Sequence, residues 1–221
     1  MVTHDASGDL QRLVDSGVVA VMRGADADTI IEVADALEAG GVTAFEITAD
    51  NPDAMALIEE VSASFSADEA IVGAGTVLDA ETARSAIASG AEFVVGPTVD
   101  EGVVETCNRY GTLVAPGALT PTEAISAYEA GADLVKVFPA STMGPSHLSS
   151  IAGPLPQIPL MPTGGIDLDN VADYVEAGAV VVGAGSAIMD DEAIAAGDFE
   201  AITETAKEFS RRIDEARDRT D

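Results

Sequence analysis

Short apolar runs alternate with amphipathic segments along almost the whole chain. The runs are rich in Val, Ile, Leu, Phe and Ala, and most directly follow a turn of small residues such as Ala88-Ser89-Gly90-Ala91 or Glu129-Ala130-Gly131-Ala132. Glycine just beyond a helix accepts the left-handed conformation that ends the helix. Such runs are typical of parallel strands covered on both faces. The pattern predicts strands at residues 17–23, 42–48, 70–75, 92–96, 112–115, 133–138, 158–162 and 179–183.

The amphipathic segments between these runs predict helices. Thr120-Pro121-Thr122-Glu123 combines a capping threonine, a proline at the first helical position and a glutamate at the third, which is a capping box. Asn51, Asp79, Asp100 and Asp167 can cap other helices. The predicted helices span about 27–39, 52–64, 80–89, 100–109, 121–130, 145–152, 168–177 and 198–218, and a short helix at 5–15 precedes the first strand.

Eight strand–helix units in 221 residues predict an α/β fold, a (β/α)8 TIM barrel with a short N-terminal helix. We expect a single domain over residues 1–221, with the barrel at about 17–215. The alternative is an open doubly wound sheet, but the glycine-rich dinucleotide-binding fingerprint expected after its first strand is missing.

The charge of the chain excludes several partners. Its formal net charge is -29, from 39 acidic against 10 basic residues. Without a basic stripe to neutralise phosphates, nucleic acid and anionic membranes are poor partners. At about 1 M salt the Debye length falls to about 3 Å, which screens repulsion among carboxylates. We therefore expect a halophilic protein; the alternative is an ordinary acidic protein, and stability at low ionic strength separates the two.

No segment indicates export or membrane insertion. The single cysteine, Cys107, cannot form an internal disulfide. The first 15 residues lack the apolar core of a signal peptide, and no apolar run reaches the roughly 18 residues of a transmembrane helix. The expected location is therefore cytoplasmic.

Lys136 is one of only two lysines, and it lies in the apolar run 133–138. The other, Lys207, belongs to a charged C-terminal helix pattern. Desolvation disfavours a charged ammonium, and a neutral amine is a nucleophile for carbonyls. The alternative is a strand-end lysine whose amine reaches solvent.

Glu46 also lies inside an apolar run, at residues 42–48. A buried carboxyl group has a raised pKa and can exchange protons near neutrality. Barrel active sites lie where strands end, so Glu46 and Lys136 should meet at one mouth. The alternative is a structural ion pair of Glu46 with Lys136 or Arg23.

Glycines follow the last two predicted strands, as Gly164-Gly165 and as Gly185-Ser186. These two loops commonly bind phosphate in barrels, because their backbone N–H groups face an anion. Tight turns without a ligand are the alternative. Elsewhere at the strand ends, Arg23, Thr76 and Thr163 can hold a small carboxylate.

Specific motifs carry a family resemblance over about residues 15–215. They are Phe45-Glu46-Ile47-Thr48, Gly73-Ala74-Gly75-Thr76-Val77, Ala115-Pro116-Gly117, Lys136-Val137-Phe138-Pro139-Ala140, Pro162-Thr163-Gly164-Gly165-Ile166 and Gly185-Ser186-Ala187. With them the chain resembles the 2-keto-3-deoxy-6-phosphogluconate (KDPG) aldolases, class I lyases of the Entner–Doudoroff route.

The resemblance implies cleavage of 2-dehydro-3-deoxy-6-phosphogluconate to pyruvate and D-glyceraldehyde 3-phosphate, without a cofactor or metal, by a homotrimer. It implies Lys136 as the Schiff-base lysine and Glu46 as the general acid/base. The expected substrate-binding residues are Arg23, Thr48, Thr76, Pro97, Phe138 and Thr163, and the expected phosphate-binding residues are Gly164, Gly165, Gly185 and Ser186.

One position departs from the family pattern. Many bacterial members have a carboxylate-binding arginine four residues after the glutamate, where this chain has Asp50. Either Asp50 points away or another group, for which Arg23 is the candidate, holds the carboxylate. Members that act on the galactonate epimer also lack that arginine and have an Asn/Ser-Pro run, like Asn51-Pro52 here, so the stereochemistry at C4 stays open.

Other functions stay possible on the sequence alone. The same chemistry could act on the 6-phosphogalactonate epimer, the unphosphorylated acid or 4-hydroxy-2-oxoglutarate. A phosphosugar isomerase or epimerase would need a second carboxylate or a metal at the mouth. A phosphosugar-binding protein would bind without turnover. The two histidines, His4 and His147, do not have the spacing of a metal site.

Overall fold

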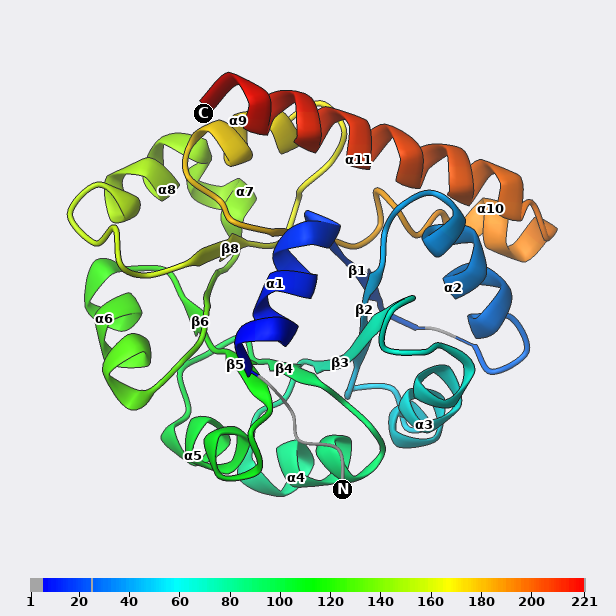
Figure 1. Cartoon of the computed structure of the whole chain (residues 1–221), viewed down its shortest axis with the longest axis horizontal. Helices are drawn as coiled ribbons and strands as arrows, with labels where there is room; N and C mark the ends of the chain where they lie inside the picture. The colour runs from blue at the N-terminus through cyan, green and yellow to red at the C-terminus, as the bar shows by residue number, and fades with distance from the viewer. Residues whose placement is uncertain (1–5, 25, 221) are drawn as a thin grey trace.

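The computed structural model describes residues 6–24 and 26–220, in which parallel strands form a barrel surrounded by helices (Figure 1). Strands pair in the orders β5-β4-β3-β2-β1-β9 and β6-β7-β8. Single bridges, Leu160 to Ala179 and Thr163 to Gly183, join β8 to β9. The strands are β1 (Val18–Met22), β2 (Ala44–Thr48), β3 (Ile71–Gly75), β4 (Phe93–Val95), β5 (Leu113–Ala115), β6 (Gly117–Ala118), β7 (Val135–Val137), β8 (Leu160–Pro162) and β9 (Val182–Ala184).

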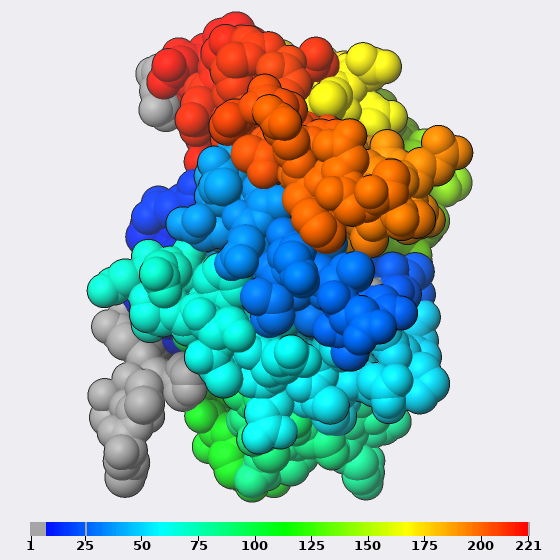
Figure 2. Space-filling view, turned by 90° about the vertical axis from the view of Figure 1, so that its right-hand side faces the viewer, coloured from blue at the N-terminus to red at the C-terminus, as the bar shows by residue number. Residues whose placement is uncertain are grey.

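Most of the helices lie around the outside of this ring, and α1 lies across its centre in Figure 1. Figure 2 shows one flank, where α2 lies between α3 and the long C-terminal helix α11. Among the described residues, no helix combines the length and the apolar character needed to cross a bilayer. The helices are α1 (Ala6–Ser16), α2 (Ile30–Ala39), α3 (Ala54–Ser64), α4 (Ala80–Ala88), α5 (Glu101–Tyr110), α6 (Pro121–Ala130), α7 (Ala140–Met143), α8 (Pro145–Ala152), α9 (Val171–Glu176), α10 (Asp191–Ala196) and α11 (Phe199–Thr220).

The predicted TIM barrel is confirmed, with one difference in its fifth strand. The chain predicts one strand at 112–115, whereas the structure has β5 and, after Pro116, the separate short strand β6. Proline has no N–H to donate to a sheet. A Cβ on Gly117 would lie 2.3 Å from the backbone of Pro97, so the chain passes very close to the loop after β4 here. As a result β5 pairs with β4, and β6 pairs with β7.

Helix starts follow the predicted capping residues in part. The capping box at Thr120 is confirmed, and Asp79 and Asp100 accept hydrogen bonds from the first turns of α4 and α5. Asn51 and Asp167 instead begin turns that precede α3 and α9, so these helices start at Ala54 and Val171. The predicted start of the first helix, residue 5, lies outside the described residues.

Two short helices are absent from the sequence prediction. Both α7 and α10 follow strands of the barrel and contain four and six residues. Segments of less than two turns cannot display a helical repeat of apolar positions, so hydrophobic periodicity does not detect them.

The buried side chains form two layers, one inside the barrel and one between the strands and the helices. Ala44 of β2 and Leu134, just before β7, belong to the inner layer. Successive side chains of a strand point to opposite faces, so the side chains two residues further along point inward as well. These are Glu46 and Lys136, which the backbone therefore directs into the barrel.

Helix α1 covers the end of the barrel at which the strands begin. Arg12 of α1 donates to Glu92 Oε2 at 2.6 Å and to the carbonyl oxygen of Ala70, just before β4 and β3 respectively. With this end covered, the interior is accessible from the end where the strands finish.

Candidate active site

A cavity of about 600 Å³ lies at the ends of the strands. All predicted site residues except Thr48 line it. The lining residues are Val21, Arg23, Glu46, Thr76, Pro97, Lys136, Phe138, Thr163, Gly164, Gly165, Ile166, Gly185, Ser186, Met189 and Asp191.

Lys136 and Glu46 face each other across the barrel. With β5 and β6 counted as one position, the order of strands places β2 and β7 four positions apart in a ring of eight. Strands so spaced lie on opposite sides of the axis, and inward side chains from them meet over the middle. Neither a hydrogen bond nor an ion pair joins the two side chains in the described part of the chain, although the charge of Lys136 acts on Glu46. Both side chains therefore line one cavity without being joined to each other.

The Lys136 amine is held inside the cavity. The residue is only 5% exposed, so it does not extend into bulk solvent. Its Nζ lies 5.0 Å from the ring centroid of Phe138, and it forms no ion pair among the residues that the structure describes. An amine without a carboxylate partner keeps its nitrogen accessible to an electrophile in the cavity.

The Glu46 carboxyl group is almost completely buried, at 1% exposure, and its Oε2 has no hydrogen-bond partner among the described residues. Burial raises the pKa of Glu46, and the positive charges of Lys136 and Arg23 offset only part of this. A Cβ on Gly75 would lie 1.9 Å from Glu46 Oε1, so the carboxyl group occupies space that only glycine leaves free. Glu46 is thus a buried carboxyl group in the cavity wall with a raised pKa and one oxygen that has no internal partner among the described residues.

Arg23 is oriented by two partners at the rim. Its Nη1 donates to Asp50 Oδ2 at 2.5 Å and its Nη2 to Thr76 Oγ1 at 3.1 Å. Thr76 has a φ of 55°, a left-handed conformation that costs a β-branched residue about 1–3 kcal/mol. Asp50 does not line the cavity. Asp50 therefore points to Arg23 and not to the cavity, and guanidinium N–H groups remain for a ligand.

The two remaining threonines differ in their position. Thr163 lines the cavity, and its buried hydroxyl oxygen has no hydrogen-bond partner among the described residues. Thr48 is fully buried, and the structure does not bring it to the cavity. Because Thr48 follows Glu46 by two positions, the sequence predicts that its side chain lies on the same face of β2. The sequence does not predict how far along the barrel axis the cavity extends.

Backbone turns form the far side of the cavity. Gly164 and Gly165 have φ values of 93° and 74°. A Cβ on Gly165 would lie 2.4 Å from Cβ of Ser141, because this turn packs directly on α7. The second loop, Gly185-Ser186, follows β9 on the neighbouring side.

Four lining residues were missed by sequence reasoning. Val21 could have been found, because it precedes Arg23 by two residues and shares its face of β1. Ile166 follows the glycine pair directly. Met189 and Asp191 belong to the segment at the start of the unpredicted helix α10, and no pattern indicates that it folds over the mouth.

Among the described residues, no group of three or more His, Cys, Asp or Glu side chains is arranged to hold a metal ion. His147 binds the carbonyl oxygen of Leu119 at 2.7 Å and does not line the cavity. His4 lies outside the described residues. The lining of the cavity thus offers one amine, the buried carboxyl group of Glu46, the carboxylate of Asp191, a guanidinium, hydroxyl groups and backbone N–H groups.

Known proteins resemble this chain over most of its length. The family model described as KDPG and KHG aldolase matches residues 10–205. The chain is 37% identical over 198 residues to the 2-dehydro-3-deoxy-phosphogluconate aldolase of Treponema pallidum (strain Nichols), covering 88% of this chain and 90% of that protein. It is 33% identical over 170 residues to the 2-dehydro-3-deoxy-6-phosphogalactonate aldolase of Escherichia coli (strain K12), covering 76% and 82%. A solved structure of the KDPG aldolase from Legionella pneumophila, with pyruvate captured at low pH as a covalent carbinolamine intermediate, matches with a TM-score of 0.83 at 28% identity over 93% of this chain and 97% of that chain.

Proposed function

The chain belongs to the KDPG and KHG aldolase family and is a carbon–carbon lyase, and we propose that Lys136 supplies the amine for the cleavage. The reaction converts 2-dehydro-3-deoxy-6-phosphogluconate to pyruvate and D-glyceraldehyde 3-phosphate. The single observation that carries the proposal is the position of Lys136, which is buried in the cavity opposite Glu46 and has no ion pair among the described residues.

The proposed reaction begins when the lone pair of the Lys136 Nζ adds to the C2 ketone of the substrate. The carbinolamine takes a proton from Glu46, directly or through a water, and loses its C2 oxygen as water to give the iminium ion. The Glu46 carboxylate then takes the C4 hydroxyl proton, directly or through a water, and the C3–C4 bond breaks to release D-glyceraldehyde 3-phosphate. The bonding electrons pass into the iminium to form an enamine. Glu46 returns a proton to C3, and water releases pyruvate and the free lysine.

The substrate carboxylate is assigned to Arg23 and the neighbouring hydroxyl groups. Arg23 is fixed by Asp50 and Thr76, so little side-chain entropy is lost when it binds an anion. Thr163 adds a hydroxyl group without an internal partner among the described residues. Asp50 thus takes part indirectly, by orienting the arginine that replaces the one missing from its own position.

Reduction with borohydride in the presence of pyruvate tests the assignment. We expect an irreversible mass increase on the peptide that contains Lys136, because reduction converts the iminium to a stable secondary amine. Peptide mapping separates this site from Lys207 and the terminal amine. A wild-type protein that gains no mass at Lys136 would refute the proposal.

We propose the phosphogluconate substrate over its C4 epimer, because the Treponema pallidum relative is named as an aldolase of 2-dehydro-3-deoxy-phosphogluconate. The Asn51-Pro52 run and the Escherichia coli relative keep the epimer as the competitor. Cleavage rates for the two epimers, the unphosphorylated acid and 4-hydroxy-2-oxoglutarate rank them directly. A higher kcat/KM for any of the other three would replace the preferred substrate.

We further propose that the chain acts as a single barrel domain in a cytoplasmic homotrimer adapted to salt. The excess of acidic residues, 39 against 10, supports the last point. Mutual repulsion destabilises the compact state and is screened as ionic strength rises. The melting temperature should therefore rise markedly from dilute buffer to molar KCl, as followed by circular dichroism. A melting temperature that stays constant or falls with salt would contradict halophilic adaptation. The mass of the particle in solution, measured by light scattering, would test the proposed trimer.

A further inference from the structure

Three consecutive carbonyl groups in the turn after β8 are hydrogen-bonded by nearby donors. Thr163 O accepts from Ala140 N at 2.9 Å, and Gly164 O accepts from Ser141 N at 3.0 Å. Gly165 O accepts from Asn170 Nδ2 at 2.9 Å. The first two donors are backbone groups of α7, whereas the third is a side chain.

These bonds decide where the N–H groups of the turn point. In a trans peptide the N–H points opposite to the C=O. The N–H groups paired with the three carbonyls belong to Gly164, Gly165 and Ile166, all of which line the cavity. None of the three donates to another group among the described residues. They therefore form a set of donors for an anion, and each is turned by the bond to its own carbonyl.

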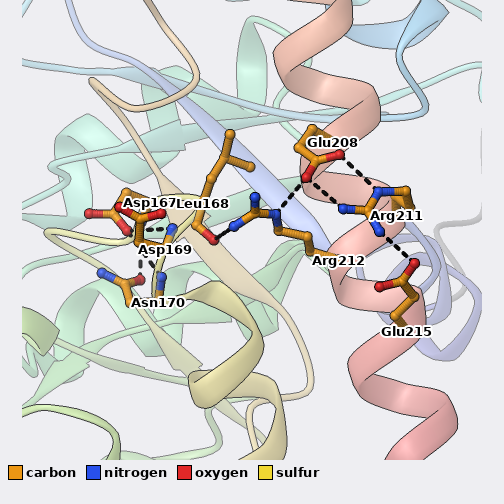
Figure 3. Close-up of polar contacts among 8 residues, drawn as sticks. All are labelled: Asp167, Leu168, Asp169, Asn170, Glu208, Arg211, Arg212 and Glu215. Atoms are coloured by element: carbon orange, nitrogen blue, oxygen red, sulfur yellow. Dashed lines mark hydrogen bonds and ion pairs between the residues drawn. The ribbon is translucent and has the colours of Figure 1, made fainter.

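The Asn170 amide is fixed at both ends. Its Nδ2 donates to Gly165 O, and its Oδ1 accepts from Asp167 N at 3.1 Å. Asp167 Oδ1 accepts in return from Asn170 N at 3.1 Å (Figure 3). Because one partner is a carbonyl and the other an N–H, only one orientation of the amide satisfies both.

The turn that contains Asn170, residues 167–170, is hydrogen-bonded to the C-terminal helix α11. Arg212 of α11 donates to Leu168 O, and its Nε donates to Glu208 Oε1 at 2.6 Å (Figure 3). Hydrogen bonds from Arg211 and Arg212 lower the pKa of Glu208 to about 2. Arg212 thus links Leu168, two residues before Asn170, to Glu208 on α11.

We propose that Asn170 is a positioning residue for the substrate phosphate, because its hold on Gly165 O directs the Ile166 N–H toward the anion. The proposal rests on the proposed function for the identity of that anion. Asn170 does not line the cavity, so it acts only through the peptide that it orients.

Two substitutions isolate this effect. Asn170→Asp keeps the shape and the bond from Asp167 N but places an acceptor against Gly165 O. Asn170→Ala removes both bonds without adding charge. Because a hydrogen bond to a charged group is at stake, KM for the phosphorylated substrate should rise about tenfold or more in both, with kcat little changed. Asp169→Ala, at the exposed neighbouring position, is the matched control and should behave as wild type.

The substrate comparison separates positioning from general damage to the turn. For the unphosphorylated acid, kcat/KM should stay within about twofold of wild type, and pyruvate should still be trapped on Lys136. Equal losses on both substrates, or an unchanged KM in Asn170→Asp, would overturn the proposal. Wild-type protein without any pyruvate trap would refute the aldolase assignment alone. In that case inorganic phosphate should still raise the melting temperature of wild type more than that of Asn170→Ala, and an equal rise would overturn the role of Asn170.

Discussion

Lys136→Met is expected to abolish cleavage and pyruvate trapping while the barrel stays folded. The substitution removes the Lys136 amine from the cavity and keeps an unbranched side chain of similar length. Loss of a covalent nucleophile costs about four orders of magnitude or more in kcat. Stability should be unchanged or higher, since Lys136 is 5% exposed and forms no ion pair among the described residues. Steady-state kinetics, borohydride trapping and thermal melting measure the three effects.

The chain offers a matched control because it contains only one other lysine. Lys207 lies on the exposed side of α11 and pairs with Glu204 at 2.8 Å. Lys207→Arg should therefore cleave substrate and trap pyruvate as wild type does. Residual turnover of Lys136→Met near the wild-type rate, or a trapped mass on another residue, would assign the Schiff base elsewhere.

Glu46→Gln is expected to lower turnover by about 10²- to 10⁴-fold and to raise stability at neutral pH. The loss of rate follows because an amide cannot exchange the proton needed at the carbinolamine and enamine steps. The gain in stability follows because burial raises the pKa of Glu46 above its ordinary value of 4.5. Ionising this group in the native state therefore costs free energy that glutamine does not incur.

The pH dependence of that gain has a definite sign. Between 4.5 and the higher native pKa, the unfolded chain releases a proton that the folded protein keeps. The ionisation of Glu46 therefore lowers the unfolding free energy of the wild type by about 1.4 kcal/mol per pH unit across this window. Above the native pKa, Glu46 is ionised in both states and lowers the unfolding free energy no further. The difference in unfolding free energy between Glu46→Gln and wild type should grow across the window and then stay constant. Urea unfolding at several pH values measures it, and a variant less stable than wild type at neutral pH would contradict this account.

The variant also tests whether Glu46 acts on protons or only holds the fold. Pyruvate binding, measured as protection against heat, should survive in Glu46→Gln because Arg23 and Thr163 remain in place. Turnover close to the wild-type rate would remove Glu46 from the mechanism.

The amino-acid sequence by itself determined the barrel and the inward direction of its two reactive groups. Strand and helix periods report the local backbone, and a charged residue inside an apolar run that ends at the mouth of a barrel is expected to face that mouth. The glycine pair Gly164-Gly165 likewise indicates a turn, and both residues have a positive φ.

Only the tertiary structure decided how these groups are arranged around the mouth. The opposition of β2 and β7 requires the closed ring, and the break at Pro116 that sends β5 and β6 to different neighbours is a property of that closure. Three features depend on distances between segments that are remote in the chain. They are the pairing of Asp50 with Arg23, the position of Thr48 outside the cavity and the position of Asp191 at its mouth. Local sequence does not encode such distances, because they arise from the packing of the whole barrel.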